Sequence, residues 1–391
     1  MKKTVITIII FTLTTLSMHS QPRLWNMDKL NNLRTEKSAA TEQILKEAHS
    51  FLIKSIPTIV DKDRPAPSGD KHDYLSCGPY WWPDPANPTG PYIRKDGETN
   101  KAVTTPDKKN LGTLTNSIVY LSLAYYLTSD EKYATKAIDN LRAWFLNPAT
   151  RMNPNLNYGQ TIYGHFGGKG RGAGMIETYK FVDLLEGIEL LKKSPAYTKN
   201  DQSGITKWFS DYLDWMVTSP IGKNEYKAKN NHGTAFEVQA TRIALFVGKE
   251  DMARKFITEF ATRRIFTQIE PDGKQPLELV RTKALGYSTF NLTHILDMCC
   301  ITKTFNIDLF NVISPDGRSI SKGFDYVSQF IGKPVSEFPY KQIVDWEVVQ
   351  DKLCLQLYRA DKFAVTPRYK TFYVNKNCNS KKDYDYIVFY K

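Results

Sequence analysis

The sequence predicts an all-α fold, an α/α toroid or barrel of about six to seven helical hairpins with a short C-terminal β-hairpin. From residue 110 onward, apolar residues recur at spacings of three and four in one segment after another, which is typical of amphipathic helices. Two of the expected hairpins share one layout, since residues 129–136 and 248–255 both contain a turn, acidic residues at a helix start, and then Ala and Lys. Repeated helical hairpins indicate a stacked helical array.

Residues 1–20 have the features of a secretory signal peptide: a basic start, an apolar run over 5–16 and small or polar residues up to Ser20. The run is too short for a permanent transmembrane helix, so stable membrane insertion is not expected. No cysteine follows the run as an acceptor for a lipid anchor. We therefore expect a periplasmic or secreted protein in which residues 21–391 form a single catalytic domain, with 366–391 as its β-hairpin tail.

The periodicity predicts a first helix over 27–56, ended by Pro57. Residues 57–107 lack periodicity but are rich in proline, glycine and aromatic residues, and such a long irregular segment is usually functional or disordered. Its tryptophans and tyrosines argue against disorder. The later helices are expected at 111–127, 132–145, 175–191, 205–217, 232–247, 252–265, 285–305, 320–331 and 344–358. Strands are expected at 371–374 and 384–390, on either side of a turn at 377–382.

The formal net charge of +12 suggests an acidic partner, such as a polyuronate, a sulfated glycan, a nucleic acid or an anionic lipid. Nucleic acid is disfavoured because the basic residues are dispersed and form no recognisable binding module. The five cysteines lack CxxC spacing, which argues against a disulfide scaffold and against a zinc site. Cys299 and Cys300 lie in an apolar helical run and are expected in the core, and the sequence allows one disulfide.

Two loop segments carry residues suited to sugar binding. In the first, residues 73–97, Tyr80, Trp81 and Trp82 offer flat faces to pyranose rings, although they could equally anchor the loop itself. The second, residues 160–172, is glycine-rich, but no strand precedes it and the Walker spacing is absent, so nucleotide binding is rejected. This segment is either a mobile loop that carries Gln160, Tyr163 and Arg171 to a cleft, or a plain linker.

Two further segments could carry out chemistry. Asn230, Asn231 and His232 precede a long apolar run, where the free N–H groups of a helix start attract an anion. Arg281 and Tyr287 lie six residues apart at the entry to another apolar helix. An arginine fork matches a carboxylate, and a tyrosine near cations can lose its proton at reduced cost. The alternatives are a helix cap with a core histidine, a surface ion pair and a core tyrosine.

Together these residues supply what β-elimination from a uronic acid requires. The proton beside a free carboxylate is not acidic, so Asn231 and Arg281 would neutralise the carboxylate and stabilise the enolate-like charge. A base then removes the C5 proton and an acid protonates the leaving glycosidic oxygen. His232 and Tyr287 are the natural pair for these two steps.

The segments at 73–85, 92–97, 230–233 and 281–288 resemble, in the same order, the signature motifs of the alginate lyase superfamily with the α/α toroid fold. The resemblance implies a lyase that needs no metal or other cofactor and acts on alginate or a related uronan. It implies that Asn231 and Arg281 bind the uronate carboxylate. Tyr287 would be the acid, and also the base when the proton and leaving group are syn, whereas His232 would be the base for the opposite epimer. The residues expected to line the cleft are Tyr80, Trp81, Trp82, Arg94, Gln160, Tyr163, Arg171 and Asn230.

The sequence departs from the general family pattern at Cys77-Gly78 and in its C-terminal tail, which leaves the subfamily and the exact substrate open. One alternative is a glycoside hydrolase on the same toroid, which needs two carboxylic acids, with Asp73, Asp84, Glu177 and Glu237 as candidates. Another is an exported glycan-binding protein without catalysis. We expect a monomer; the sequence indicates neither the preferred uronate nor endo or exo action.

Overall fold

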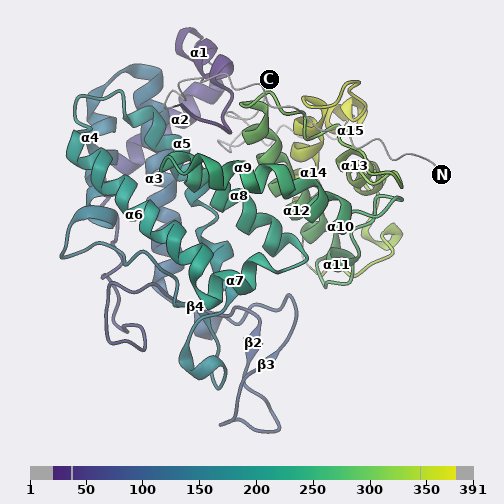
Figure 1. Ribbon diagram of the computed structural model, residues 1–391, viewed down its shortest axis with the longest axis horizontal. Helices are drawn as coiled ribbons and strands as arrows, with labels where there is room; N and C mark the ends of the chain where they lie inside the picture. Colours follow the sequence, from purple (N-terminus) through teal and green to yellow (C-terminus); the bar gives the residue numbers. More distant parts are fainter. Residues whose placement is uncertain (1–20, 37, 344, 376–391) are drawn as a thin grey trace.

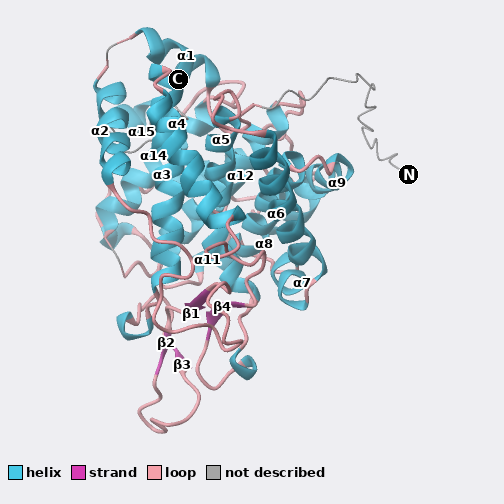
Figure 2. Cartoon of the chain, turned by 90° about the vertical axis from the view of Figure 1, so that its left-hand side faces the viewer, coloured by secondary structure: helices cyan, strands magenta, loops and turns pink. Residues whose placement is uncertain are grey.

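The computed structural model describes residues 21–36, 38–343 and 345–375, so the expected signal peptide lies outside the described residues. The long helices run side by side, and the loops that carry the described strands gather at one end of them (Figures 1 and 2). No helix in the described part of the chain combines the length and apolar character that crossing a bilayer requires.

The long helices form two layers. In the inner layer, α3 (Pro106–Thr128), α5 (Phe181–Leu191), α8 (Asn231–Phe246), α12 (Ala284–Lys303) and α14 (Trp346–Asp361) pack one against the next. The outer layer contains α2 (Ala39–Ile53), α4 (Glu131–Leu141), α6 (Lys199–Thr218), α9 (Glu250–Phe260) and α13 (Ile320–Ser328). The inner helices α3, α8 and α12 are buried along most of their length, whereas α4 buries one stripe, as expected for an outer helix. The α/α toroid expected from the sequence is therefore confirmed.

The remaining helical segments are short. They comprise α1 (Met27–Thr35), α7 (Pro220–Tyr226), α10 (Phe266–Gln268), α11 (Pro276–Leu279) and α15 (Lys370–Asn375). Short 3₁₀ segments occur at η1 (Lys101–Val103), η3 (Phe166–Gly168), η4 (Gly172–Thr178) and η6 (Val335–Glu337), and π turns occur at η2 (Arg142–Leu146) and η5 (Ala261–Ile265). The π turns extend α4 and α9.

Several boundaries differ from the expected ones for local reasons. The helix expected over 27–56 is two helices, because Ser38 caps α2 by accepting a hydrogen bond from the N–H of Thr41. The helix expected from 205 begins at Lys199, where Thr198 and Asp201 form a capping box. The segment 175–191 begins with the 3₁₀ turn η4, and α5 starts only at Phe181. The sequence analysis missed α7, which Pro220 opens.

The strand expected at 371–374 is wrong, because these residues lie in α15. Aromatic and β-branched residues favour strands, but packing overrides that preference here. Tyr373 packs against Tyr358 of α14 with ring centroids 5.1 Å apart. Tyr369, just before α15, is buried and donates its hydroxyl to Asp325 of α13. The turn and the second strand expected at 377–390 lie outside the described residues.

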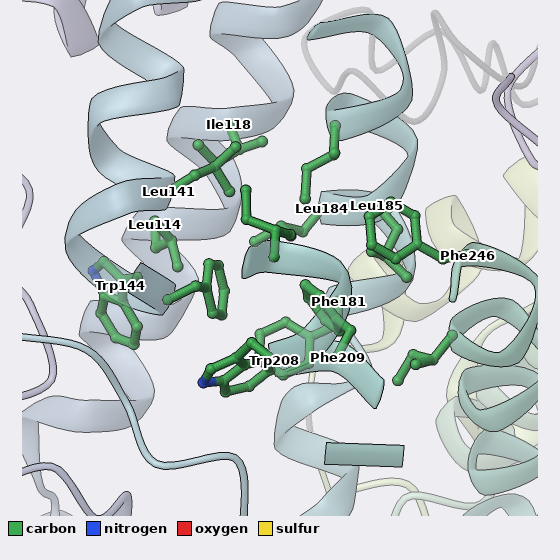
Figure 3. Packing of buried hydrophobic residues seen from close by; sticks show 14 of the residues in the cluster. Leu114, Ile118, Leu141, Trp144, Phe181, Leu184, Leu185, Trp208, Phe209 and Phe246 are labelled. Atoms are coloured by element: carbon green, nitrogen blue, oxygen red, sulfur yellow. The ribbon is translucent and has the colours of Figure 1, made fainter. Parts of the chain in front are cut away.

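The core fills the space between the two layers. In the half of the molecule built from α3 to α6, the rings of Phe181, Trp208 and Phe209 pack together (Figure 3). The ring centroid of Trp208 lies 4.6 Å from that of Phe145 and 5.8 Å from that of Phe181. Cys299 is buried, as expected, but Cys300 is only partly buried. Cys354 is disulfide-bonded, whereas the other described cysteines are free thiols.

Short strands tie the irregular segment 57–107 to the helices. β1 (Leu75–Cys77) pairs in parallel with β4 (Tyr158–Thr161), and β2 (Trp81–Trp82) pairs antiparallel with β3 (Ile93–Arg94). Asp107 at the start of α3 accepts hydrogen bonds from the Lys62 ammonium at 2.5 Å and from the N–H of Leu75 at 2.7 Å. The loops that roof one end of the inner helices are thus held by strand pairing and by a buried ion pair.

Candidate active site

A cavity of about 870 Å³ lies at the loop-bearing end of the helices. Most of the side chains proposed for the site from the sequence line it: Tyr80, Arg94, Gln160, Arg171, Asn230, Asn231, His232, Arg281 and Tyr287. Trp81 and Tyr163 instead line a neighbouring cavity of about 880 Å³, and Trp82 lies in neither wall. The Trp82 indole donates to the carbonyl of Glu98, so this ring anchors its own loop.

His232 lies in the first turn of α8, and a buried carboxylate holds its ring. Nδ1 of His232 lies 2.6 Å from Oε1 of Glu225, which is at the end of α7 and is 5% exposed. The carboxylate accepts a hydrogen bond from the Nδ1–H group of the neutral ring, so the basic lone pair of the ring is on Nε2. The His232 side chain is 22% exposed in the cavity wall, which suits a group that exchanges protons with a ligand.

The start of α8 is already occupied by a carboxylate of the protein. Glu278 of α11 accepts from both the backbone N–H and the side-chain amide of Asn231, each at 2.7 Å. Oδ1 of Asn230 caps the helix by accepting a hydrogen bond from the backbone N–H of His232. The expectation that free helix-start N–H groups receive the substrate is therefore wrong for the N–H groups of Asn231 and His232. Gly233 is required next because a Cβ there would lie 2.0 Å from the carbonyl of Ala228.

Arg281 is held by Asp96, a residue of the roofing loop (residues 79–105). Its Nε and Nη2 donate to Asp96 at 3.1 and 2.7 Å, and Asp96 also accepts from the N–H of Thr282. Partial burial alone would raise the pKa of Asp96, but these hydrogen bonds and the guanidinium charge of Arg281 hold that pKa well below its usual range. Nη1 of Arg281 makes no hydrogen bond to another described residue, so it is available to an anionic ligand.

Tyr287 lies one turn into α12 and directly below this arginine. Its hydroxyl accepts from Nη2 of Arg281 at 2.9 Å and donates to the hydroxyl of Tyr80 at 3.1 Å. Burial raises the pKa of Tyr287, Tyr80 raises it further, and Arg281 opposes this only in part. Burial and Tyr80 thus outweigh the cation that was expected to ease ionisation, and they favour a protonated hydroxyl that can act as an acid.

A second wall of the cavity is a polar chain from β4 to α3. Arg171 donates to Gln160 at 2.6 Å, Gln160 donates to Glu177 at 3.3 Å, and Lys108 lies 3.3 Å from the same carboxylate. Gln160 has φ of 51°, a left-handed conformation that is unfavourable for a residue with a side chain and that often occurs at functional sites. Lys180 is exposed at the same wall.

Sequence reasoning missed the carboxylates that hold the site together, which are Asp96, Glu225 and Glu278. Asp96 lies within a segment proposed for the site from the sequence, and Glu278 lies three residues before another, but neither pattern indicates which partner the carboxylate contacts. Glu225 lies in α7, a helix too short to give a periodic signal. Lys108 and Lys180 were also missed, because single lysines at helix starts have no distinctive spacing.

The carboxylates considered for a hydrolase are not arranged as a pair across the cavity. Glu177 lines it, whereas Glu237 is fully buried and pairs with Arg264 at 3.0 Å. Asp73 is buried and accepts from Ser68 and Asn153. Asp84 lines neither of the two cavities described above. In the described part of the chain, no three His, Cys, Asp or Glu side chains gather as metal ligands.

Comparison with known proteins gives a consistent result. The family model described as alginate lyase matches residues 58–336. The crystal structure of an alginate lyase from Bacteroides ovatus has 44% identity and a TM-score of 0.91, over 94% of this chain and 98% of that one. No curated protein sequence matches significantly.

More distant structures share the fold. Alginate lyase A1-III in complex with a tetrasaccharide aligns with a TM-score of 0.62 at 13% identity, over 96% of this chain and 98% of that one. The structure of alginate lyase A1-III from Sphingomonas species A1 gives a TM-score of 0.58 at 13% identity, with the same shares covered. On its match to the family model and its identity to the Bacteroides enzyme, the chain belongs to the alginate lyase family, a family of polysaccharide lyases.

Proposed function

We propose that the protein cleaves alginate or a related polyuronate by β-elimination and releases unsaturated oligosaccharides. The observation that carries the proposal is that four side chains from α8, α12 and the turn between α11 and α12 line one cavity: Asn231, His232, Arg281 and Tyr287. A guanidinium, an imidazole and a phenol within reach of one ligand are the groups that the reaction requires.

The residues divide the reaction as follows. Nη1 of Arg281 receives the uronate carboxylate and stabilises the charge that builds up when C5 loses its proton. Nε2 of His232, oriented by Glu225, takes that proton for one epimer. Tyr287, whose hydroxyl keeps its proton in the free protein, protonates the leaving O4. When both groups lie on one side of the ring, Tyr287 can be the base only after its own proton has passed to solvent, with the adjacent Arg281 guanidinium stabilising the phenolate. The phenolate then takes the C5 proton and passes it to O4.

An acidic polymer suits the rest of the wall. Arg94, Lys108, Arg171 and Lys180 line the cavity in addition to the reaction centre, and the cavity is large for a small-molecule site, so it can hold more than one sugar. Carboxylates of neighbouring residues in the polymer would meet these cations. Tyr80 provides an aromatic face at the reaction centre, and Trp81 and Tyr163 would contact sugars that extend into the neighbouring cavity.

We also propose that the protein is exported to the periplasm or the medium and works as a monomer that binds no nucleic acid. The signal-like residues 1–20 support export. The disulfide of Cys354 supports it independently, because disulfides persist in oxidising compartments. Detection of the mature chain in periplasmic or culture fractions, and its elution volume in gel filtration, test these points.

Ultraviolet absorbance during digestion of defined mannuronate, guluronate and glucuronate polymers tests the reaction. Elimination creates a conjugated double bond, so we expect absorbance to rise with every bond cleaved. New reducing ends without absorbance would indicate hydrolysis, and binding without shortening would indicate a glycan-binding protein. A chelator should leave the rate unchanged; a loss of activity that one divalent ion restores would contradict the metal-free mechanism.

A further inference from the structure

The side-chain amide of Asn231 donates to a carboxylate of the protein itself. Both of its hydrogen-bond donors in this region, the backbone N–H and Nδ2, are directed at Glu278, whose residue exposure is 1%. The two oxygens of Glu278 accept one of these hydrogen bonds each, an arrangement that favours the ionised form, which accepts at both oxygens. While Glu278 is ionised, one N–H of the Asn231 amide is committed to it, and only the second N–H of Nδ2 remains for a uronate carboxylate.

The other end of the same amide has no partner. Oδ1 of Asn231 is buried and accepts no hydrogen bond within the described part of the chain, although Asn231 lines the cavity. Buried acceptors without a donor are uncommon in native proteins because they lose their hydration without replacement. An amide oxygen would also repel a carboxylate. This orphaned oxygen is an observation independent of the Glu278 contact, and it indicates that the amide adopts a different orientation when substrate is bound.

We propose that Glu278 is a positioning residue that sets the orientation of the Asn231 amide, and that the uronate carboxylate binds when Glu278 is neutral. The inference rests on the proposed function. One proton from solvent adds to the Glu278 carboxylate, and the amide of Asn231 turns end for end. The new O–H of Glu278 donates to Oδ1 of Asn231, and its other oxygen continues to accept the backbone N–H. Nδ2 then donates to the substrate, and the proton returns to solvent when the product leaves.

The charges around Glu278 favour this exchange. Burial raises the pKa of its carboxyl, while the Asn231 hydrogen bonds and the charges of Arg281 and His232 act in the opposite direction. Asp96 pairs with Arg281 and Tyr287 of α12 touches it, so the guanidinium that faces Glu278 is already compensated, and the His232 ring is paired with Glu225. A uronate carboxylate beside Asn231 adds a like charge, which favours the neutral form of Glu278. Substrate binding and protonation are thereby linked.

The test measures protons taken up on binding. A saturated alginate tetrasaccharide is titrated calorimetrically into Tyr287→Phe protein, which should bind without turnover, in buffers of different ionisation enthalpy between about pH 5 and pH 9, the range spanned by glutamates from exposed to buried. The same titration is made with the double variant Tyr287→Phe, Glu278→Gln. The amide of glutamine reproduces the neutral carboxyl, because it offers one donor to Oδ1 and one acceptor to the backbone N–H. Glu250→Gln in the same background is the matched control, since it removes one exposed negative charge on α9.

We expect the Tyr287→Phe protein to take up close to one proton per tetrasaccharide over part of this range, with Kd rising about tenfold per pH unit there. The double variant should take up none at those pH values and bind with a Kd that is flat with pH. The Glu250→Gln control should behave like Tyr287→Phe alone. Zero proton uptake by the Tyr287→Phe protein throughout overturns the inference, even if the double variant does not fold. Unchanged uptake in the folded double variant also overturns it. The proposed function is tested separately by the ultraviolet product assay on the unaltered enzyme, so the two can fail independently.

Discussion

Oε1 of Glu225 lies 2.6 Å from Nδ1 of His232, and it joins the end of one helix to the first turn of the next. The carboxylate is almost fully buried, whereas the imidazole remains accessible from the cavity. This is the arrangement by which a carboxylate selects the tautomer of a histidine base and fixes its orientation. Glu225 is therefore as important to the proposed chemistry as the histidine itself, although it does not contact substrate in this role.

We predict that Glu225→Gln lowers kcat by about 100-fold or more on the uronate epimer for which His232 is the base, because the wrong tautomer becomes favoured. KM should change little, since the carboxylate does not contact the ligand. Steady-state kinetics on purified mannuronate and guluronate polymers would separate the two parameters. Equal losses on both epimers, or a change in KM alone, would contradict the assignment. Glu189→Gln, which alters a carboxylate of α5 outside the cavity lining, provides the control.

Tyr287→Phe should lower kcat by orders of magnitude while the protein remains folded, because only the hydroxyl is removed. Burial raises the pKa of Tyr287, so the hydroxyl keeps its proton as the pH rises through neutrality. The alkaline loss of the acid function should therefore lie above about pH 10, the ordinary value for tyrosine. The pH profile of kcat and circular dichroism would check these points. Tyr80→Phe, which removes the neighbouring hydroxyl, should cost much less; an equal loss would argue against Tyr287 as the acid.

Asp96→Asn should loosen the roofing loop over residues 79–105, because it removes the ion pair with Arg281 and weakens the hydrogen bonds from Thr282. We expect faster proteolytic cleavage in this loop and a lower kcat/KM. The pKa of Asp96 is depressed in the folded protein, so its contribution is complete above about pH 4 and is lost only as the pH falls through the lower folded value. The effect of the variant should accordingly be constant across the neutral range.

Glu98→Gln is the matched control for this loop, because it removes a carboxylate two residues away that takes part in no ion pair among those found in the described residues. Its proteolysis pattern and kinetics should match those of the parent. If Asp96→Asn were cleaved at the parental rate, the roofing loop would be held by β2 and β3 rather than by Arg281.

Arg242→Met should destabilise the fold by about 3–5 kcal/mol, because it leaves Glu186 buried without its cation. Nε of Arg242 donates to Glu186 at 2.6 Å, and both side chains are at most 1% exposed. The backbone N–H groups of Arg23 and Leu24 also donate to Glu186, so the N-terminal segment should detach early in unfolding. Denaturant titration would measure the change. Lys207→Met, which breaks an exposed ion pair with Asp211 on α6, should have little effect.

The sequence by itself determined the helical class, most of the long helices and four segments of functional residues. Helix periodicity is a local property. The polar residues around Asn231 and Arg281 stand at the entry to apolar runs, so these residues are easily recognised in the sequence. Aromatic residues were a weaker guide, because the same tryptophan can face a sugar or anchor its own loop, as Trp82 does. The strand expected at 371–374 failed for a related reason, since packing against α14 decided its conformation.

Only the tertiary structure decided which charges meet. Asp96 and Arg281 are separated by 185 positions, and Asn231 and Glu278 by 47, so no local pattern could connect them. Their pairing depends on how the roofing loop and α11 close over the ends of α8 and α12. The tertiary structure also decided that Glu278 accepts a hydrogen bond from the backbone N–H of Asn231 at the start of α8. The N–H groups at a buried helix start need an acceptor, and a nearby carboxylate satisfies them.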